Sequence, residues 1–276
     1  MAFSIAISGK GGTGKTTISA LMVRCLIGKS PQAVLAVDAD PNACLGLALG
    51  IEPGRTVSDI RDEVLNQKTA PGAGINRLDQ FEYGAHQVLT EAEGFDLLTM
   101  GRPEGPGCYC SANNIIRKFM DELSGTYGYV VNDNEAGMEH LSRRTTNNVD
   151  VLAIVAEPTV VGIKTARRII QLTDALPINV KEIGIIWNKT DTPPAVNGVD
   201  VLGCVPVDEA VFRASMKGTT VFDLPDDNSA LLAIQNIVEH KVAPAAKRGI
   251  NAKREPIVID PPSGGGGFAR NGYTKK

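Results

Sequence analysis

The chain has 276 residues, of which 43% are hydrophobic, and its formal net charge is −3. This length accommodates a large α/β domain, and the slightly acidic balance gives no electrostatic support for nucleic-acid binding. The five cysteines of a chain this long do not make the disulfide framework of a small secreted domain, and no stretch approaches the roughly 18 uninterrupted apolar residues of a membrane span.

The first segment of the chain predicts a strand, a glycine-rich turn and a helix. Residues 3–8 form a short apolar run, residues 9–16 read GKGGTGKT, and an apolar helical pattern covers residues 17–27. The turn fits G-x-x-x-x-G-K-[ST], the phosphate-binding P-loop, in the strand–loop–helix context that this motif requires. No charged region precedes the strand, so we expect no signal peptide and a cytoplasmic location.

A P-loop assigns specific roles to the residues of this segment. The glycines allow backbone N–H groups to surround a phosphate, and the helix N-terminus adds partial positive charge at the same place. Lys15 is expected to reach the β- and γ-phosphates of ATP, and the Thr16 hydroxyl to ligate Mg²⁺. The alternative is an ordinary glycine-rich turn without a ligand. The predicted nucleotide-binding residues here are Gly11, Gly12, Thr13, Gly14, Lys15, Thr16 and Thr17.

Farther along the chain, apolar strands alternate with amphipathic helices. Strands are expected at residues 33–40, 95–101, 127–133, 149–157, 182–188 and 201–205, and helices near 57–65, 112–123, 139–146, 160–175 and 230–238. This alternation predicts an α/β fold with a mostly parallel sheet and helices on both faces. We expect one P-loop ATPase domain over residues 1–246. Residues 247–276 are rich in proline, glycine and basic residues and are expected to be a disordered tail, or alternatively a partner-binding arm.

Aspartates end two of the predicted strands, where open α/β sheets bind their ligands. Asp38 and Asp40 close the strand at 33–40, and Asp133 closes the strand at 127–133, in which Asn132 is unexpectedly polar. We expect Asp40 to orient the water that attacks the γ-phosphate, and Asp38 and Asp133 to hold Mg²⁺ through water. For each aspartate, a solvated strand end is the alternative.

Cys108 and Cys110 stand two residues apart in a segment that contains prolines and glycines. Two such thiolates can bind one metal ion together, but they cannot complete a four-ligand site alone. A two-fold symmetric dimer that brings two copies of this segment together supplies four sulfur ligands for Ni²⁺ or Zn²⁺. Two free thiols and a redox pair are the alternatives.

The sequence GKGGTGKTT, with its second lysine at position 10, resembles the deviant P-loop of the MinD, ParA and nitrogenase iron protein superfamily. The resemblance implies a homodimer in which Lys10 reaches the nucleotide of the partner subunit. VDADPN at residues 37–42 resembles the first switch segment of that superfamily. DNEAG at residues 133–137 resembles the second switch segment, in which Gly137 moves toward the γ-phosphate.

Two later segments resemble the adenine pocket of the same superfamily. Asn188 follows an apolar strand and precedes Lys189 and Asp191, which is similar to the adenine-reading pattern N-K-x-D. The residues Pro206, Val207 and Asp208 resemble the opposite wall of that pocket. An asparagine after a strand is also an ordinary turn residue.

The segment GRPEGPGCYCSANNIIR, together with the later DNEAGMEHLSRRT, resembles the CooC family of nickel-insertion ATPases, which mature carbon monoxide dehydrogenase. With GKGGTGKTT, VDADPN and AEPT, the similarity covers residues 1 to about 241. It implies an ATP-dependent homodimer that binds Ni²⁺ at paired C-x-C motifs and acts on carbon monoxide dehydrogenase. We expect neither a nucleic-acid nor a membrane partner.

Other functions within this superfamily are alternatives to nickel delivery to carbon monoxide dehydrogenase. Acetyl-CoA synthase is an alternative client enzyme. A MinD- or ParA-like positioning ATPase needs a basic amphipathic C-terminal helix or a basic face, whereas the helix before Lys241 carries Glu239 and only one lysine. A nitrogenase-like iron protein has its two cysteines far apart in sequence. A cobyrinic-acid amidating synthase needs a glutaminase domain, for which this chain is too short. We interpret His140 as a helix-surface residue.

Overall fold

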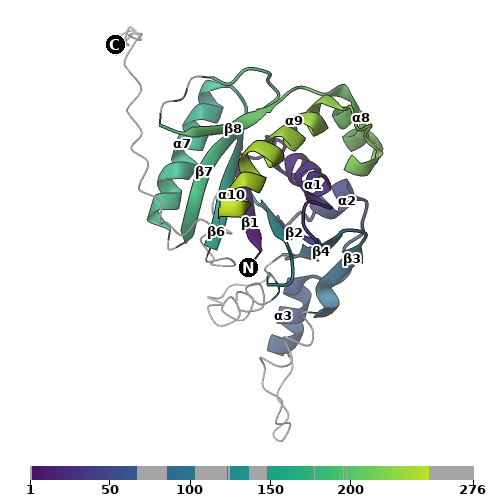
Figure 1. Cartoon of the computed structure of the whole chain (residues 1–276). Coiled ribbons are helices and arrows are strands. Elements are labelled where there is room, and N and C mark those ends of the chain that lie inside the picture. The colour runs from purple at the N-terminus through teal and green to yellow at the C-terminus, as the bar shows by residue number, and fades with distance from the viewer. Residues whose placement is uncertain are drawn as a thin grey trace, which may run out of the picture.

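The computed structural model describes residues 2–66, 86–102, 123, 125–136, 148–176, 178–194, 196 and 198–248 (Figure 1). Its centre is an eight-stranded sheet in the order β3-β4-β2-β5-β1-β6-β7-β8. Every pairing is parallel except that of β3 with β4 at one edge, which is antiparallel. The carboxyl ends of the parallel strands therefore meet at one edge of the sheet, where ligands bind in this class of fold.

The strands are short apolar runs whose side chains are buried on both faces. Phe3, Ile5 and Ile7 pack with α1 (Lys15–Leu26) and α9 (Ser229–Ile237), whereas Ala6 belongs to the core cluster on the other side, with α7 (Val160–Ala175). This alternation is the two-residue period of a strand, and it produces a hydrophobic layer on each face of the sheet. The strand bounds are β1 Phe3–Gly9, β2 Val34–Ala39, β3 Leu89–Ala92, β4 Phe95–Thr99, β5 Tyr129–Asn134, β6 Asn148–Ala156, β7 Asn179–Asn188 and β8 Asp200–Val205.

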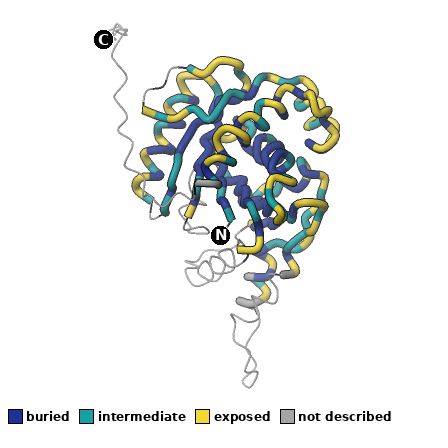
Figure 2. Tube along the Cα trace, viewed as in Figure 1, coloured by how far each residue is buried: buried dark blue, intermediate teal, exposed yellow. Residues whose placement is uncertain are grey.

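The helices cover both faces of the sheet, and Figure 1 shows α1 beside α9. The remaining helices are α2 Leu45–Leu49, α3 Val57–Asn66, α8 Glu209–Lys217 and α10 Ala243–Arg248, with the 3₁₀ turns η1 His86–Val88 and η2 Val221–Asp223. The π-helical segment η3 Val238–Val242 joins α9 to α10. The Arg24 guanidinium ties α1 to η2, because it donates to the carbonyl oxygens of Val221 and Leu224 at 2.6 and 2.8 Å. Figure 2 shows the resulting buried interior.

The predicted α/β fold class is confirmed, and the predicted strands are found with small differences at their ends. Among the elements that the sequence analysis did not predict, β3 is a short edge strand of half-buried and exposed residues, α2 is only five residues long, and α8 has no buried residue. The short helix α10 and the turns η1, η2 and η3 were not predicted either. Helix α1 begins two residues earlier than expected, directly at Lys15. Asn132 is buried in β5, where its amide nitrogen lies 3.5 Å from both the Ser4 hydroxyl and the Ile5 carbonyl oxygen.

Several expectations fall on residues that the structure does not describe. These are the helices expected at 112–123 (except Leu123) and 139–146, and the tail beyond Arg248. The described chain continues as α10 through Lys247 and Arg248, two residues past the expected end of the ATPase domain at 246. Within the described ranges, no helix is both long enough and apolar enough to cross a membrane.

Candidate functional site

The glycine-rich loop between β1 and α1 has a backbone that depends on glycine. Gly12 and Gly14 have φ values of 80° and 90°, in the left-handed region that favours this residue. A Cβ atom on Gly9 would stand 2.3 Å from the Val155 carbonyl oxygen of β6. The Thr13 hydroxyl closes the turn by donating to the Lys10 carbonyl oxygen at 2.8 Å. The loop thus curls tightly at the N-terminus of α1, the arrangement that receives a phosphate.

Asn188, at the end of β7, supports this loop directly. Its side-chain nitrogen donates to the Thr13 carbonyl oxygen at 2.7 Å, and its side-chain oxygen accepts from the Lys189 backbone N–H at 3.0 Å. The approach is so close that a Cβ atom on Gly14 would lie 2.5 Å from the Asn188 amide nitrogen. Asn188 therefore fixes the shape of the loop, a role that the sequence did not reveal.

Lys15, Thr16 and Asp133 converge at the start of α1. Lys15 is buried, and its positive charge acts on the Asp133 carboxylate at the end of β5. Asp133 Oδ1 accepts from the Ser19 hydroxyl at 3.0 Å, and the Thr16 hydroxyl also bonds to this carboxylate. Asp133 Oδ2, although buried, has no hydrogen-bond partner among the residues that the structure describes. A buried carboxylate oxygen left unpaired beside a hydroxyl and an ammonium fits a divalent cation with its coordinated water.

Asp38 and Asp40 take different positions at the end of β2. Asp38 is fully buried and lies beside Asp133 in the β2–β5 register. Its two oxygens accept from the backbone N–H groups of Asp40 and Leu45 at 3.2 and 2.8 Å. Asp40 is half-buried, and its carboxylate accepts from both the backbone and side-chain nitrogens of Asn42 at 2.9 Å. Asp38 is thus enclosed in the loop, whereas Asp40 lies at the surface of the site.

Burial raises the pKa of Asp38 to about 7, and the neighbouring Asp133 carboxylate adds to this effect against two backbone hydrogen bonds. Burial likewise raises the pKa of Asp133 to about 6, although Thr16, Ser19 and Lys15 oppose it. The folded chain therefore holds these two protons more tightly than the unfolded chain. The resulting stability is fully present below about pH 4 and is lost as the pH rises to about 7.

We expect the free energy of unfolding of the metal-free protein to fall between pH 5 and 7.5, with a smaller fall in Asp38→Asn, because that variant removes one of the two raised pKa values. Urea unfolding in EDTA at a series of pH values measures the free energy of unfolding of the wild type and of Asp38→Asn. Mg²⁺ should stabilise the protein more at pH 7.5 than at pH 5.5, since it favours the ionised carboxylates. The exposed Glu93 provides a control, Glu93→Gln, that should keep the wild-type slope. A wild-type protein whose stability does not change over this range would contradict the assignment.

A cavity of about 340 Å³ opens beside the loop, between α1 and α8. All four residues expected in the base pocket line it, namely Asn188, Pro206, Val207 and Asp208, together with Gly14 and Thr17 from the loop side. The Asp208 carboxylate is already engaged, because it accepts from the Val211 backbone N–H at 3.0 Å and from the Ser229 hydroxyl at 2.5 Å. Burial raises the pKa of Asp208, but these hydrogen bonds outweigh that effect and lower it. Asp208 thus caps α8 as an anion, and Asp191 is exposed.

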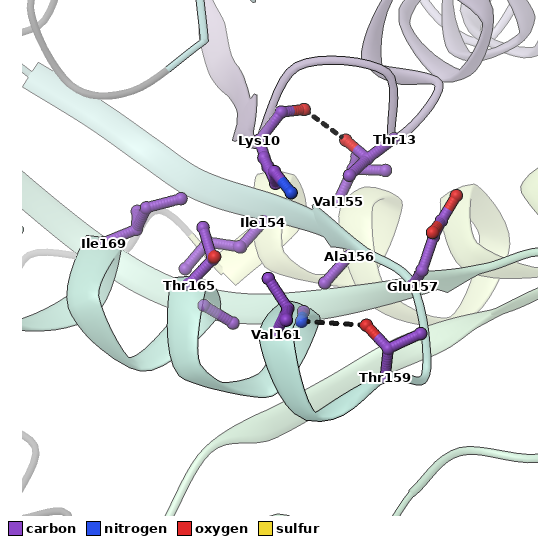
Figure 3. A pocket seen from close by; sticks show the side chains of 12 residues that line it. Lys10, Thr13, Ile154, Val155, Ala156, Glu157, Thr159, Val161, Thr165 and Ile169 are labelled. Carbon is purple, nitrogen blue, oxygen red and sulfur yellow. Dashed lines mark hydrogen bonds between the residues drawn. The ribbon is translucent and has the colours of Figure 1, made fainter.

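Lys10 faces a second, smaller cavity on the opposite side of the loop. This cavity measures about 60 Å³ and lies between the loop, the end of β6 and the first turns of α7. Figure 3 shows the Lys10 ammonium directed toward this cavity, near Val161 and Ile154. Lys10 is exposed and does not line the base cavity, and it differs in this from Lys15, which is buried. The two lysines of the loop therefore occupy different environments.

Three expected site residues, Cys108, Cys110 and Gly137, lie outside the described residues, as does His140. In the part of the chain that the structure describes, no three His, Cys, Asp or Glu side chains form a group able to hold a metal ion. Mg²⁺ at Thr16, Asp38 and Asp133 would therefore keep most of its ligands as water and phosphate. The sequence analysis missed Ser19, which donates to Asp133, and Phe212, which lines the cavity of about 340 Å³. A serine one helical turn after Lys15 is a signal in the sequence that could have indicated Ser19. No sequence pattern indicated Phe212.

Residues 4–221 match the model of the CobQ/CobB/MinD/ParA nucleotide binding domain. The chain is 39% identical to an uncharacterized ATP-binding protein of Methanocaldococcus jannaschii over 85% of its length and 96% of the relative. It is 32% identical to the carbon monoxide dehydrogenase accessory protein CooC of Rhodospirillum rubrum, over 80% of this chain and 89% of that protein. The crystal structure of a ParA family ATPase from Chlorobium tepidum shares the fold, with a TM-score of 0.67 at 19% identity, over 87% of this chain and 98% of that one.

Proposed function

The chain belongs to the CobQ/CobB/MinD/ParA family of nucleotide-binding domains, and within this family we propose that it is an ATPase that delivers nickel to carbon monoxide dehydrogenase. It is an ATP-binding protein of the MinD/ParA type. The finer function is carried by one observation, the 32% identity with a carbon monoxide dehydrogenase accessory protein over most of both chains. The pair Cys108 and Cys110, which resembles the nickel-binding motif of that family, supports it.

In the proposed reaction, ATP binds with its triphosphate in the loop and its base in the cavity of about 340 Å³. Backbone N–H groups from Gly11 to Thr17 surround the phosphates, and Lys15 compensates the charge of the β- and γ-phosphates. Thr16, Asp38 and Asp133 would hold Mg²⁺, which when bound neutralises charge that develops on the transferred phosphoryl group. Asp40, at the surface of the site, accepts a proton from the attacking water.

We assign Lys10 to the partner subunit's nucleotide. Its exposed position at the second cavity, and not in the lining of the base cavity of its own chain, supports this assignment. The active form is then a homodimer with two composite sites. Gly137 moves with the γ-phosphate as the second switch. Hydrolysis loosens the dimer and separates the two cysteine pairs, which releases the metal to the client.

Nickel is the cargo in this proposal, and Zn²⁺ is the competing metal for a thiolate site. Two protomers contribute Cys108 and Cys110, so we expect about one metal ion per dimer. Cys108→Ser combined with Cys110→Ser should lose this ion and keep ATP binding. Anaerobic Ni²⁺ and Zn²⁺ titration followed by sedimentation measures the metal content and the oligomeric state together. The matched control is Cys44→Ser with Cys204→Ser, because these described free thiols lie away from the pair in the sequence.

Two outcomes would remove the nickel proposal. One is a metal ion bound to each monomer and retained in the Cys108, Cys110 variant. The other is a control variant that loses the metal as the cysteine pair variant does. Activation of apo carbon monoxide dehydrogenase compared with apo acetyl-CoA synthase, each supplied with the Ni²⁺-loaded protein and ATP, then identifies the client. Neither enzyme would be activated if the chain is a MinD-like positioning ATPase.

A further inference from the structure

Helix α8 forms one wall of the base cavity but is held to the molecule at few points. None of its nine residues is buried. Its start is fixed by the Asp208 cap, and the same carboxylate accepts from Ser229 at the start of α9. Its end is closed by Gly218, whose φ is 67°. The helix is thus fixed at its first turn, and Val211 and Ala214 pack against the core, while Phe212 and Met216 remain exposed.

Phe212 lies in this first turn and is an unusual residue for its environment. Its backbone N–H donates to the Asp208 carbonyl oxygen at 3.2 Å, and this bond fixes the Phe212 backbone in the first turn of the helix. The ring lines the base cavity, and yet 63% of the residue is exposed. A phenylalanine gains stability by burial, so a ring left open at a cavity wall suits a flat apolar ligand that covers it.

The opposite side of the cavity provides a matching surface. Ile18 and Leu21 of α1 are buried and apolar, and they line the cavity across from α8. Polar side chains lie on both sides of the cavity. Asn188 and Lys189 line it beside the loop, and Asp208, Glu209 and Ser215 line it on the side of α8. A purine base joined to phosphates in the loop therefore enters a space with an aromatic ring on one wall and aliphatic side chains on the other.

We propose that Phe212 stacks on the base of the bound nucleotide and supplies a large part of the base affinity. This rests on the nucleotide site of the proposed function, and it adds a residue and an energetic role to that site. Stacking acts through the ring face and needs no hydrogen bond, so the ring matters and its polar substituents do not. Asp208 and Ser229 act as positioning residues, since they hold the first turn of α8.

The test compares Phe212→Ala, Phe212→Tyr and the wild type by calorimetry with ATP and with tripolyphosphate, which has the phosphates but no base. Phe212→Ala should raise the dissociation constant for ATP by about tenfold, because loss of one aromatic–base stack is worth this order of affinity. Phe212→Tyr keeps the ring and should bind ATP like the wild type. Tripolyphosphate should bind all three proteins equally.

Met216→Ala is the matched control. Met216 lies one turn farther along α8, is 74% exposed and does not belong to the cavity wall. It should leave ATP affinity unchanged. Unchanged ATP affinity in Phe212→Ala, or an equal loss in Met216→Ala, would overturn the proposal, and so would a parallel loss of tripolyphosphate affinity. A wild-type protein that binds neither compound would instead refute the nucleotide site itself, and the stacking role with it.

Discussion

Lys15→Ala is expected to raise the dissociation constant for ATP by at least about 100-fold and to abolish measurable hydrolysis. Lys15 is only 7% exposed and stands at the N-terminus of α1, close enough to Asp133 to influence its titration. Removal of a buried charge leaves its partner uncompensated, which costs about 2–5 kcal/mol or more at such sites. The triphosphate would then meet the Asp133 and Asp38 carboxylates without the positive charge of the lysine. Calorimetry and phosphate release measure the two losses.

Lys10→Ala is the matched control for Lys15→Ala, because it removes the same side chain from the same loop at an exposed position. It should leave the ATP affinity of the protomer largely unchanged and reduce turnover. Mixed with Asp40→Ala protein, it should recover part of the activity, since one composite site of the heterodimer keeps both residues. Retention of wild-type ATP affinity in Lys15→Ala would contradict the assignment of that lysine. Full activity of Lys10→Ala alone would contradict a role in the partner's site.

That the proposed site residues meet at one edge of the sheet could be predicted from the sequence, because the carboxyl ends of neighbouring parallel strands lie side by side. Asp38 and Asp133 are far apart in the chain, yet the register of β2 and β5 pairs them directly. The same rule brings Asn188 and Pro206 to the edge where the loop begins. Each of these residues lies at or just after the end of an apolar run that predicts a buried strand. The strand pattern and the parallel topology therefore put all of them at the same edge of the sheet, although neither specifies a side-chain contact.

Other parts of the site depend on contacts that no local pattern encodes. The bond from Asn188 to the Thr13 carbonyl oxygen joins two segments whose approach is decided by how β7 packs beside β6 and β1. Phe212 belongs to α8, a short helix whose apolar residues all stay at least partly exposed, and the sequence analysis did not predict this helix. The edge strand β3 was missed for a related reason, since its half-buried and exposed residues read as a loop. Tertiary packing, rather than propensity, determines all three.

Asp40→Ala is expected to keep ATP binding and to lower the turnover number by about 10²–10⁴-fold, the usual contribution of a general base. Asp40 lies just beyond the end of β2, outside the enclosure that holds Asp38. Within the described part of the chain, its oxygen Oδ1 is bonded only within its own turn, to Asn42. The carboxylate therefore takes no part in holding the loop or the phosphates. Its removal should leave affinity intact and remove only the group that orients and deprotonates the water. Single-turnover phosphate release at saturating ATP measures this step directly.

Two variants separate the chemistry of Asp40 from its local structure. Asp40→Asn keeps an oxygen that can accept from the Asn42 backbone N–H but cannot take a proton, so it should be as slow as Asp40→Ala. Asn42→Ala removes the side-chain donor to Asp40 at 2.9 Å while leaving the carboxylate in place, so it should retain most of the turnover. If Asn42→Ala were as slow as Asp40→Ala, the turn itself, and not the carboxylate, would be the requirement. Normal turnover in Asp40→Asn would show that the attacking water loses its proton elsewhere.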